Sequence, residues 1–365
     1  MRAAVLPEFE APLVLEELEL LPPGPRDVVV RPGAVEVCVT DSYATRPGPL
    51  SRPPAILGHS AAGVVEAVGS AVTTVAPGDR VLVAGTPACG DCFWCRRGEG
   101  HQCREIFEGG VRHVARRADG TLVSAAGGVG TYAEQLLVRE YGVVRMDTTL
   151  PDEHLCLLSC GAASALGAVF GIARVGLGDT VAVLGAGRIG GWLLQAARLA
   201  GAVRVVAVEP LPERRKRAAA LGASDVLDPA DGDVVEQVRD LTGGRGVDAA
   251  FEATGGPGTA AAVRTAFAAT RRGGVVVPLG MTDFGVTVDL PVNDLAMRGR
   301  EVRSCQYGNV DLQRDLPRYA RVLESGLLDP VAMVERTYPL PDAGSALAAA
   351  EDREVLTAVL LPNSD

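Results

Sequence analysis

The pattern of apolar and polar positions changes once along the chain, near residue 175. Before this point, short apolar runs are separated by turn signals such as Pro22-Pro23-Gly24 and Pro77-Gly78-Asp79. Runs of this kind are typical of strands in an irregular, mostly β domain. We therefore predict strands at Val28–Arg31, Gly63–Ala67 and Arg80–Val83.

After residue 175, short apolar runs alternate with helical segments. The apolar runs predict strands at Thr180–Leu184, Arg204–Val208, Val226–Leu227, Val247–Glu252 and Val275–Leu279. The segments between them predict helices at Arg188–Ala200, Glu213–Leu221, Val234–Leu241 and Thr259–Arg271. Alternation of this length indicates a doubly wound parallel sheet and places the chain in the α/β class. After about residue 305 the alternation lapses, and we expect only a short helical stretch and β-like ends.

Composition narrows the classes of protein that are possible. The chain has 365 residues, of which 47% are hydrophobic, enough for two domains with a sizeable core. Its net charge of −10 argues against a nucleic-acid partner. An uninterrupted apolar run of about 18 residues is missing, so we expect no membrane span. Glu8 and Glu10 stand where a signal peptide would be apolar, and we therefore expect a cytoplasmic protein.

Four cysteines form a compact C-x2-C-x2-C-x7-C cluster in a lobe of about residues 89–103. They are Cys89, Cys92, Cys95 and Cys103. Gaps of two residues let successive thiolates turn toward one point, and four thiolates leave no open coordination position, which is typical of structural zinc. An iron–sulfur cluster is the main alternative, because four cysteines can hold either.

A glycine-rich loop follows the predicted strand Thr180–Leu184 directly. Gly185, Gly187 and Gly190 give the pattern G-x-G-x-x-G and lead into a predicted helix. Glycines in this context let the main chain approach a pyrophosphate at the helix N-terminus. We predict a dinucleotide site that includes the intervening residues Arg188 and Ile189.

An acidic residue at the end of the next strand bears on which dinucleotide binds. Glu209 lies about 20 residues beyond the loop, where an acid binds the adenosine ribose hydroxyls. A carboxylate there would repel the 2′-phosphate of NADP, so we predict NAD(H). Arg214 is a further candidate for contact with the ribose, although Arg214, Arg215 and Lys216 also fit a solvated helix face.

Three further residues of kinds that bind metals lie far apart in the sequence: Cys38, His59 and Cys160. A lone cysteine or histidine is more often a buried structural residue than a ligand, and the residues around these three do not link them to one site. Taken in order along the chain, however, the motifs resemble those of the zinc-containing medium-chain alcohol dehydrogenases. The shared motifs are C-x-T-D at 38–41, G-H-x-x-x-G at 58–63, P-G-D-R-V at 77–81, the four-cysteine lobe, Cys160-Gly161 and the glycine loop.

The resemblance implies a two-domain architecture and a site. It implies a GroES-like, mostly β catalytic domain over residues 1–161 and 306–365, and a Rossmann domain over 162–305. A catalytic zinc, in addition to the structural one, would be held by Cys38, His59 and Cys160. Thr40 would hydrogen-bond the substrate oxygen, and Asp41 would orient the ligand histidine.

The resemblance also implies the reaction and the remaining partners. Hydride would pass between NAD(H) and an alcohol or carbonyl substrate. Leu279, Cys305 and Tyr307 would complete the cofactor site, the last two near the nicotinamide. A homodimer or homotetramer is expected on the same grounds.

Three residues depart from the family pattern. Ser60 replaces the glutamate that usually follows the zinc histidine. Tyr43 stands where alcohol-active members often have a proton-relay histidine, and a phenol has an unperturbed pKa of about 10. Gly85 stands where ethanol-active members carry a narrowing aromatic, which favours a substrate bulkier than ethanol; an ordinary turn residue is the alternative.

Ser60 and Tyr43 motivate a second hypothesis with the same fold. The cofactor would stay bound and cycle internally, or the enzyme would reduce an activated C=C or C=N bond in a biosynthetic pathway. A third hypothesis is a non-catalytic NAD-binding protein. The retention of all three zinc ligands together with Thr40 argues against this third hypothesis.

Overall fold

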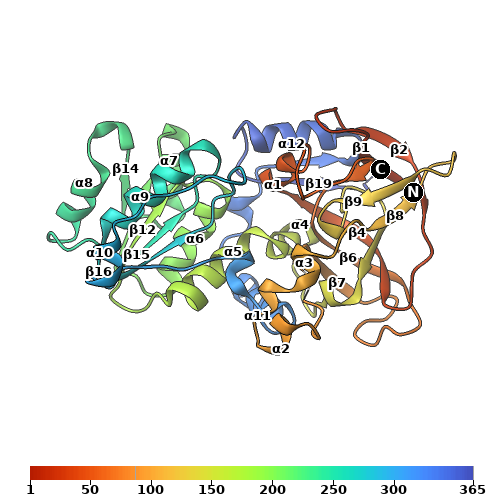
Figure 1. Cartoon of the computed structure of the whole chain (residues 1–365), viewed down its shortest axis with the longest axis horizontal. Coiled ribbons are helices and arrows are strands. Elements are labelled where there is room, and N and C mark those ends of the chain that lie inside the picture. Colours follow the sequence, from red (N-terminus) through yellow and green to blue (C-terminus); the bar gives the residue numbers. More distant parts are fainter. Residues whose placement is uncertain (87, 365) are drawn as a thin grey trace. The chain divides into compact units, whose positions relative to one another are not determined.

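The computed structural model describes residues 1–86 and 88–364, which form two compact units. The first unit contains Met1–Ala163, Val310–Gly326 and the residues from Pro330 onward, and the second contains Ser164–Asn309 and Leu327–Asp329. The first is the GroES-like unit and the second is the Rossmann unit, as the α/β assignment predicts (Figure 1).

Two β-sheets build the first unit. One sheet has the strand order β2-β1-β5-β9-β8-β3, and the other has the order β11-β7-β6-β4-β19-β18, with β10 also paired to β4. The strands are β1 (Arg2–Leu6), β2 (Val14–Glu17), β3 (Glu19–Leu20), β4 (Asp27–Val37), β5 (Ala55–Ile56), β6 (Ser60–Val68), β7 (Arg80–Ala84), β8 (His113–Arg116), β9 (Leu122–Ala125), β10 (Leu136–Arg139), β11 (Val143–Arg145), β18 (Arg336–Pro339) and β19 (Ala358–Leu361).

Strand β4 is much longer than the predicted run Val28–Arg31. The prediction stopped at Pro32 and Gly33, which usually interrupt a strand. The structure accommodates them because the β4–β6 register shifts between Pro32 and Ala34, so pairing resumes beyond the irregularity. The extension matters for the site, because it carries β4 as far as Val37.

The helices of the first unit are short at its start and longer near the C-terminus. They are α1 (Val39–Tyr43), α2 (Phe93–Arg96), α3 (Arg104–Phe107), α4 (Asp152–Leu155), α11 (Leu312–Glu324) and α12 (Ala343–Glu351), and α5 (Gly161–Leu166) runs on into the second unit. The expectation of one short helical stretch after residue 305 is therefore wrong. Pro317 lies inside α11 and hides its pattern, yet Leu312, Leu316 and Leu323 are buried along one face of the helix.

The second unit is a six-stranded parallel sheet in the order β14-β13-β12-β15-β16-β17. Its strands are β12 (Thr180–Leu184), β13 (Arg204–Val208), β14 (Asp225–Leu227), β15 (Val247–Glu252), β16 (Thr270–Pro278) and β17 (Glu301–Val302). The strand order reverses between β12 and β15, which is the point where doubly wound sheets bind ligands.

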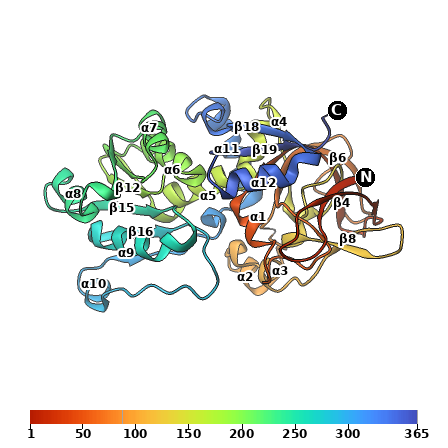
Figure 2. The same ribbon diagram turned by 90° about the horizontal axis from the view of Figure 1, so that it is seen from above.

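Helices cover both faces of this sheet. They are α6 (Arg188–Leu199), α7 (Pro212–Ala220), α8 (Val234–Leu241), α9 (Thr259–Ala269) and α10 (Val292–Ala296). Figure 2 shows α6 and α7 on one face and α9 on the other. The predicted end of the helix at Arg271 is wrong. Thr270 already begins β16, and Arg271 is drawn beside β15 by a 2.6 Å bond from its Nε to Asp248.

Apolar residues fill the inside of each unit. Tyr132 and Trp192 are the largest fully buried side chains, one in each unit. Within the described residues, no single helix is long and apolar enough to cross a membrane. The segments Asp152–Ser159 and Gly161–Ala173, bent by 49°, pass the same length and composition test as a pair, as buried core helices also do.

A close strand contact at Gly63 gives a test of the first unit. A Cβ atom at Gly63 would overlap the main chain of Arg31 and Pro32, so we expect Gly63→Ala to lower the free energy of unfolding by about 1–3 kcal/mol. Gly344 is exposed in α12 with open space around it, and Gly344→Ala should raise the free energy of unfolding by up to about 1 kcal/mol. Denaturant melts of both variants check these opposite signs, and equal effects would contradict the steric argument.

Candidate metal and nucleotide sites

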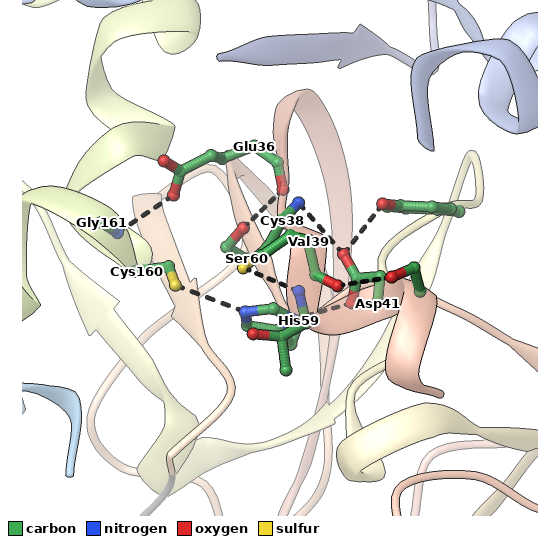
Figure 3. Close-up of polar contacts among 11 residues, drawn as sticks. Glu36, Cys38, Val39, Asp41, His59, Ser60, Cys160 and Gly161 are labelled. Carbon is green, nitrogen blue, oxygen red and sulfur yellow. Dashed lines mark hydrogen bonds and ion pairs between the residues drawn. The ribbon is translucent and has the colours of Figure 1, made fainter. Parts of the chain in front are cut away.

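The first unit brings Cys38, His59 and Cys160 to one point (Figure 3). Cys38 follows β4 and caps α1, His59 immediately precedes β6, and Cys160 lies between a 3₁₀ turn at Cys156–Ser159 and α5. The Nε2 atom of His59 lies 3.4 Å from Sγ of Cys160. The ligand atoms of all three residues lie within 4.8 Å of one another. The long β4 and the start of β6 thus place two ligands side by side.

Asp41 fixes the orientation of the histidine ring. Its Oδ1 atom lies 2.8 Å from Nδ1 of His59, which leaves Nε2 facing Cys160. The other oxygen of Asp41 accepts hydrogen bonds from the Tyr132 hydroxyl at 2.8 Å and from the main-chain N–H of Cys38 at 3.3 Å. Asp41 is only 3% exposed, so these bonds satisfy a buried carboxyl group. No sequence motif marked Tyr132, which lies 91 positions after Asp41.

The surroundings of His59 favour a positive charge. Burial lowers the pKa of His59, but the Asp41 carboxylate and the Cys160 sulfur outweigh burial and raise this pKa well above its ordinary value in the metal-free chain. An environment that stabilises a proton on the ring is also suited to a bound cation.

The residues that flank these ligands have distinct positions. Thr40 is half-buried in the first turn of α1, and its N–H donates to Sγ of Cys38 at 3.4 Å. Tyr43 ends α1, and the Arg46 guanidinium lies 5.4 Å from the centre of its ring. A Cβ atom at Gly85 would lie 2.7 Å from Cβ of His59. Glycine at position 85 therefore makes room for the ligand histidine itself, a role that neither the wider-pocket nor the turn interpretation of Gly85 included.

The four cysteines of the lobe also converge. The Sγ atoms of Cys92 and Cys95 lie 3.6 Å apart, and those of Cys92 and Cys103 lie 3.9 Å apart. Tetrahedral zinc with Zn–S bonds of about 2.3 Å requires sulfurs about 3.8 Å apart. This spacing fits a single ion. An iron–sulfur cluster would place several iron atoms between the thiolates and hold the sulfurs farther apart.

The main chain of the four-cysteine lobe favours the thiolate form of Cys92. Hydrogen bonds from the main chain at Arg104 and Cys95 lower the pKa of Cys92 to about 6, whereas burial raises the pKa of Cys95 to about 12. The thiolate is the form of cysteine that binds a metal, so the lowered pKa of Cys92 suits a metal ligand.

The three-residue site fits zinc by the same reasoning. A nitrogen and a sulfur bound to one tetrahedral zinc lie about 3.6 Å apart, and the observed distance from His59 to Cys160 is 3.4 Å. Two sulfurs and one imidazole nitrogen are ligands that zinc prefers, and three protein ligands leave a fourth position open for a substrate oxygen.

The glycine loop of the second unit is shaped for close main-chain contact. A Cβ atom at Gly190 would overlap the carbonyl oxygen of Gly185, and one at Gly185 would lie 2.8 Å from the carbonyl oxygen of Ala253. Helix α6 begins at Arg188, with Ile189 in its first turn and Gly187 as its N-cap residue without a side-chain cap. Its first N–H groups are therefore suited to a phosphate, since no side-chain cap in the described chain competes for them.

Glu209 lies at the end of β13 and bonds to this loop. Its two carboxyl oxygens accept the N–H groups of Ala186 at 2.8 Å and of Leu211 at 3.0 Å. Arg214 lies beside the loop, since a Cβ atom at Gly187 would be 3.2 Å from its guanidinium. Arg215 is partly exposed and donates to the carbonyl oxygen of Glu209 at 2.9 Å, whereas the Lys216 side chain is 73% exposed and fits a solvated helix face.

The remaining predicted cofactor residues follow the carboxyl ends of neighbouring strands in the same unit. Leu279 comes directly after β16, and its N–H donates to the carbonyl oxygen of Glu252 at 2.8 Å. Cys305 follows β17, and burial raises its pKa to about 12. Tyr307 has a positive φ of 53° beside Gly308, whose main chain packs against Gly167. The carboxyl ends of parallel strands form one edge, so these residues share that edge with the glycine loop.

Comparison with known proteins finds two family models that match this chain. The family model described as "Alcohol dehydrogenase GroES-like domain" matches residues 24–148, and "Zinc-binding dehydrogenase" matches residues 189–325. The NDMA-dependent alcohol dehydrogenase of Amycolatopsis methanolica is 31% identical, over 100% of this chain and 99% of that protein. This chain belongs to the zinc-containing medium-chain alcohol dehydrogenase family.

Solved structures of similar proteins extend the likeness over the whole chain. Benzyl alcohol dehydrogenase from Acinetobacter calcoaceticus is 27% identical, with a TM-score of 0.90 over 99% of this chain and 98% of that chain. A dehydrogenase structure from Sinorhizobium meliloti 1021, bound to NADP, is 28% identical, with a TM-score of 0.82 over 99% of both chains. This alcohol dehydrogenase family member therefore shares both its units with enzymes of known structure.

The lobe geometry leads to a test of its role. We expect Cys92→Ser to lose one zinc per chain and to lower the free energy of unfolding by about 2 kcal/mol or more, since a structural metal stabilises the fold directly. Cys305→Ser is the matched control, because Cys305, like Cys92, is a half-buried thiol and lies outside both cysteine groups. Elemental analysis and thermal melts check the pair, and a Cys92→Ser protein with full zinc would remove the lobe from metal binding.

Proposed function

We propose that this alcohol dehydrogenase family member transfers hydride between NAD(H) and an alcohol or carbonyl substrate, with zinc at both metal sites. The observation that carries the proposal is the convergence of Cys38, His59 and Cys160, with Asp41 orienting the histidine. This arrangement has an open fourth position, as catalytic zinc sites do, whereas the four-cysteine lobe has none.

Asp41, Thr40 and Tyr43 have separate roles near the substrate oxygen. Zinc, when bound, polarises that oxygen, and the nicotinamide exchanges hydride with the carbon that carries it. Asp41 keeps the proton of His59 on Nδ1, so Nε2 stays available as a ligand. Thr40 follows Cys38 by two residues and offers a hydroxyl that accepts the substrate proton. Tyr43, one turn further along α1, would pass the proton toward solvent.

Glu209 supports NAD as the cofactor. Its carboxylate bonds to the glycine loop at Ala186, where the 2′-phosphate of NADP would bring additional negative charge. Arg214 beside Gly187 and the similar structure bound to NADP favour the opposite choice. The buried acid supports NAD more strongly, because moving a phosphate next to it would cost more than the half-buried Arg214 returns.

For the substrate we propose an alcohol bulkier than ethanol, with aromatic alcohols first. The support is the likeness to benzyl alcohol dehydrogenase over nearly the whole chain. Because the absence of a side chain at Gly85 makes room for His59, Gly85 gives no separate support for a bulkier substrate.

We also propose a homodimer or homotetramer in the cytoplasm. Exposed apolar side chains occur along the segment 284–302, which ends in the edge strand β17 of the second unit, and they support association. They are Phe284, Val286, Val292, Leu295, Met297 and Val302. The eight cysteines are thiols, which suits a reducing compartment.

Zinc content and cofactor use test the proposed function together. We expect about two zinc ions per chain, and oxidation of benzyl alcohol with NAD at a higher kcat/KM than with NADP. Elemental analysis and absorbance of the reduced nicotinamide measure both. Two zinc ions without turnover of any alcohol or carbonyl would contradict the reaction, and a preference for NADP would contradict the role of Glu209.

One relative favours a second candidate function. The relative from Amycolatopsis methanolica is named for dependence on NDMA. In this chain the corresponding possibility is a cofactor that stays bound and is recycled in place. Turnover by dialysed protein with NDMA and no added NAD would favour this candidate, whereas strict dependence on added NAD would exclude it.

Thr40 gives a test of the proposed proton transfer. We expect Thr40→Ala to fold normally, to keep both zinc ions and to lower kcat/KM for alcohol oxidation by about 10²-fold, since it removes a hydroxyl that transfers a proton. Thr40→Ser keeps the hydroxyl and should retain most of the activity. Steady-state kinetics across a pH series compare the two variants, and equal kinetics would remove Thr40 from the mechanism.

A further inference from the structure

A buried carboxyl group that no sequence motif marked lies beside the three-ligand site. Glu36 is fully buried near the end of β4, two residues before the ligand Cys38. Its Oε2 atom accepts a hydrogen bond of 3.2 Å from the main-chain N–H of Gly161. Gly161 directly follows the ligand Cys160, and Figure 3 shows the Glu36 side chain reaching across to this turn. One residue thus connects the segments that carry two of the ligands.

The same residue is also bonded to the segment that carries the third ligand. Ser60 directly follows His59, and its hydroxyl donates to the carbonyl oxygen of Glu36 at 2.9 Å. Ser60 is fully buried as well. The main chain of Glu36 therefore holds the start of β6, and its side chain holds the start of α5.

A third hydrogen bond completes the set. Ser159 directly precedes Cys160, and its hydroxyl donates to the carbonyl oxygen of Ala61 on β6 at 3.1 Å. The three segments are therefore joined in pairs: β4 to β6, β4 to the Cys160 turn, and that turn to β6. Each bond involves a fully buried side chain, and a broken hydrogen bond in such surroundings leaves a polar group without water to replace it.

Glu36 acts through its neighbours rather than as a ligand. The group of side chains whose donor atoms lie within 4.8 Å of one another consists of Cys38, His59 and Cys160 and does not include Glu36. Its bonds end on residues adjacent to ligands, where a change of main-chain position turns the ligand away from the metal. This is how outer residues of metal sites tune affinity.

We propose that Glu36 is a positioning residue of the catalytic metal site, holding the Cys160 turn through the Gly161 N–H and the His59 strand through Ser60. The proposal rests on zinc binding at this site, as in the proposed function. It assigns to Glu36 a role in retaining the metal that is separate from substrate chemistry. The acceptor oxygen of the side chain carries this role.

The rate at which zinc leaves the holoenzyme tests the proposal. Zinc release to an excess of a colorimetric chelator should have two phases, and the phase that is missing in His59→Ala belongs to the three-ligand site. Outer residues of metal sites typically change affinity by about 10–100-fold. We expect Glu36→Ala to accelerate this one phase by about tenfold or more and to leave release from the four-cysteine lobe unchanged.

Two variants separate positioning from general stability. Glu36→Gln keeps an acceptor oxygen for the Gly161 N–H, and we expect it to restore most of the slow release. Glu140→Ala removes another buried carboxyl group of the same unit, one that pairs with Arg26, and should leave zinc release unchanged even if the melting temperature falls.

The outcomes are distinct. Equal release rates in wild-type and Glu36→Ala protein would overturn the proposal and leave the proposed function intact, provided that wild type holds two zinc ions. Equal acceleration in Glu36→Gln and Glu36→Ala would overturn the acceptor role, and loss of both zinc ions in Glu36→Ala would reduce Glu36 to a folding role. Wild-type protein with one zinc ion, held in the lobe, would overturn both proposals.

Discussion

The hydrogen bond between His59 and Asp41 decides which face of the imidazole meets the two cysteine sulfurs. A neutral histidine offers one donor and one acceptor nitrogen, so a partner at Nδ1 commits Nε2 to the metal. This commitment depends in turn on Asp41 being held still. The Tyr132 hydroxyl and the Cys38 N–H provide that restraint, and the second of them comes from a ligand residue itself. The same carboxyl group of Asp41 therefore both orients the His59 ring and holds the main chain of Cys38.

The second unit meets a different constraint, which is close approach of main chain to main chain. The turn from β12 into α6 leaves no space for a side chain at Gly190, because the carbonyl oxygen of Gly185 already occupies that place. Glu209 then bonds to the N–H of Ala186 inside the same turn. The acid that bears on the choice of cofactor is thus also part of the loop that would hold the pyrophosphate, and a substitution at Glu209 alters both.

The sequence predicted what depends on local spacing and missed what depends on long-range contact. The cysteine lobe and the glycine loop each occupy fewer than 20 consecutive residues, so spacing, together with the strand and helix predicted around the glycine loop, indicated a metal site and a dinucleotide site. The ligands Cys38, His59 and Cys160 come from segments up to about 120 residues apart, and only resemblance to a family joined them. Tyr132 offered no signal, because a tyrosine between Thr131 and Ala133 belongs to no motif, and its function shows only when the partner of its hydroxyl is known.

Errors in the predicted elements have the same origin. Pro32 in β4 and Pro317 in α11 are residues that normally end an element, and in both places the surrounding packing prevails over local preference. Local sequence left a wider pocket and an ordinary turn as interpretations of Gly85, and it did not reveal that a side chain there would meet the ligand histidine. In each case the deciding contact lies in another segment of the chain, where a periodicity cannot show it.

Ser60 acquires a physical meaning from this arrangement. Ser60 directly follows His59 and begins β6. Its short hydroxyl side chain bonds across to the main chain of β4 at Glu36. The carboxyl group of this neighbourhood is instead on Glu36. Asp41 and Glu36 then play parallel parts, since each accepts a main-chain N–H at or next to a cysteine ligand, at Cys38 and at Gly161. Both cysteines are therefore restrained through the backbone by buried acids, which hold the two segments where the cysteine sulfurs converge with His59.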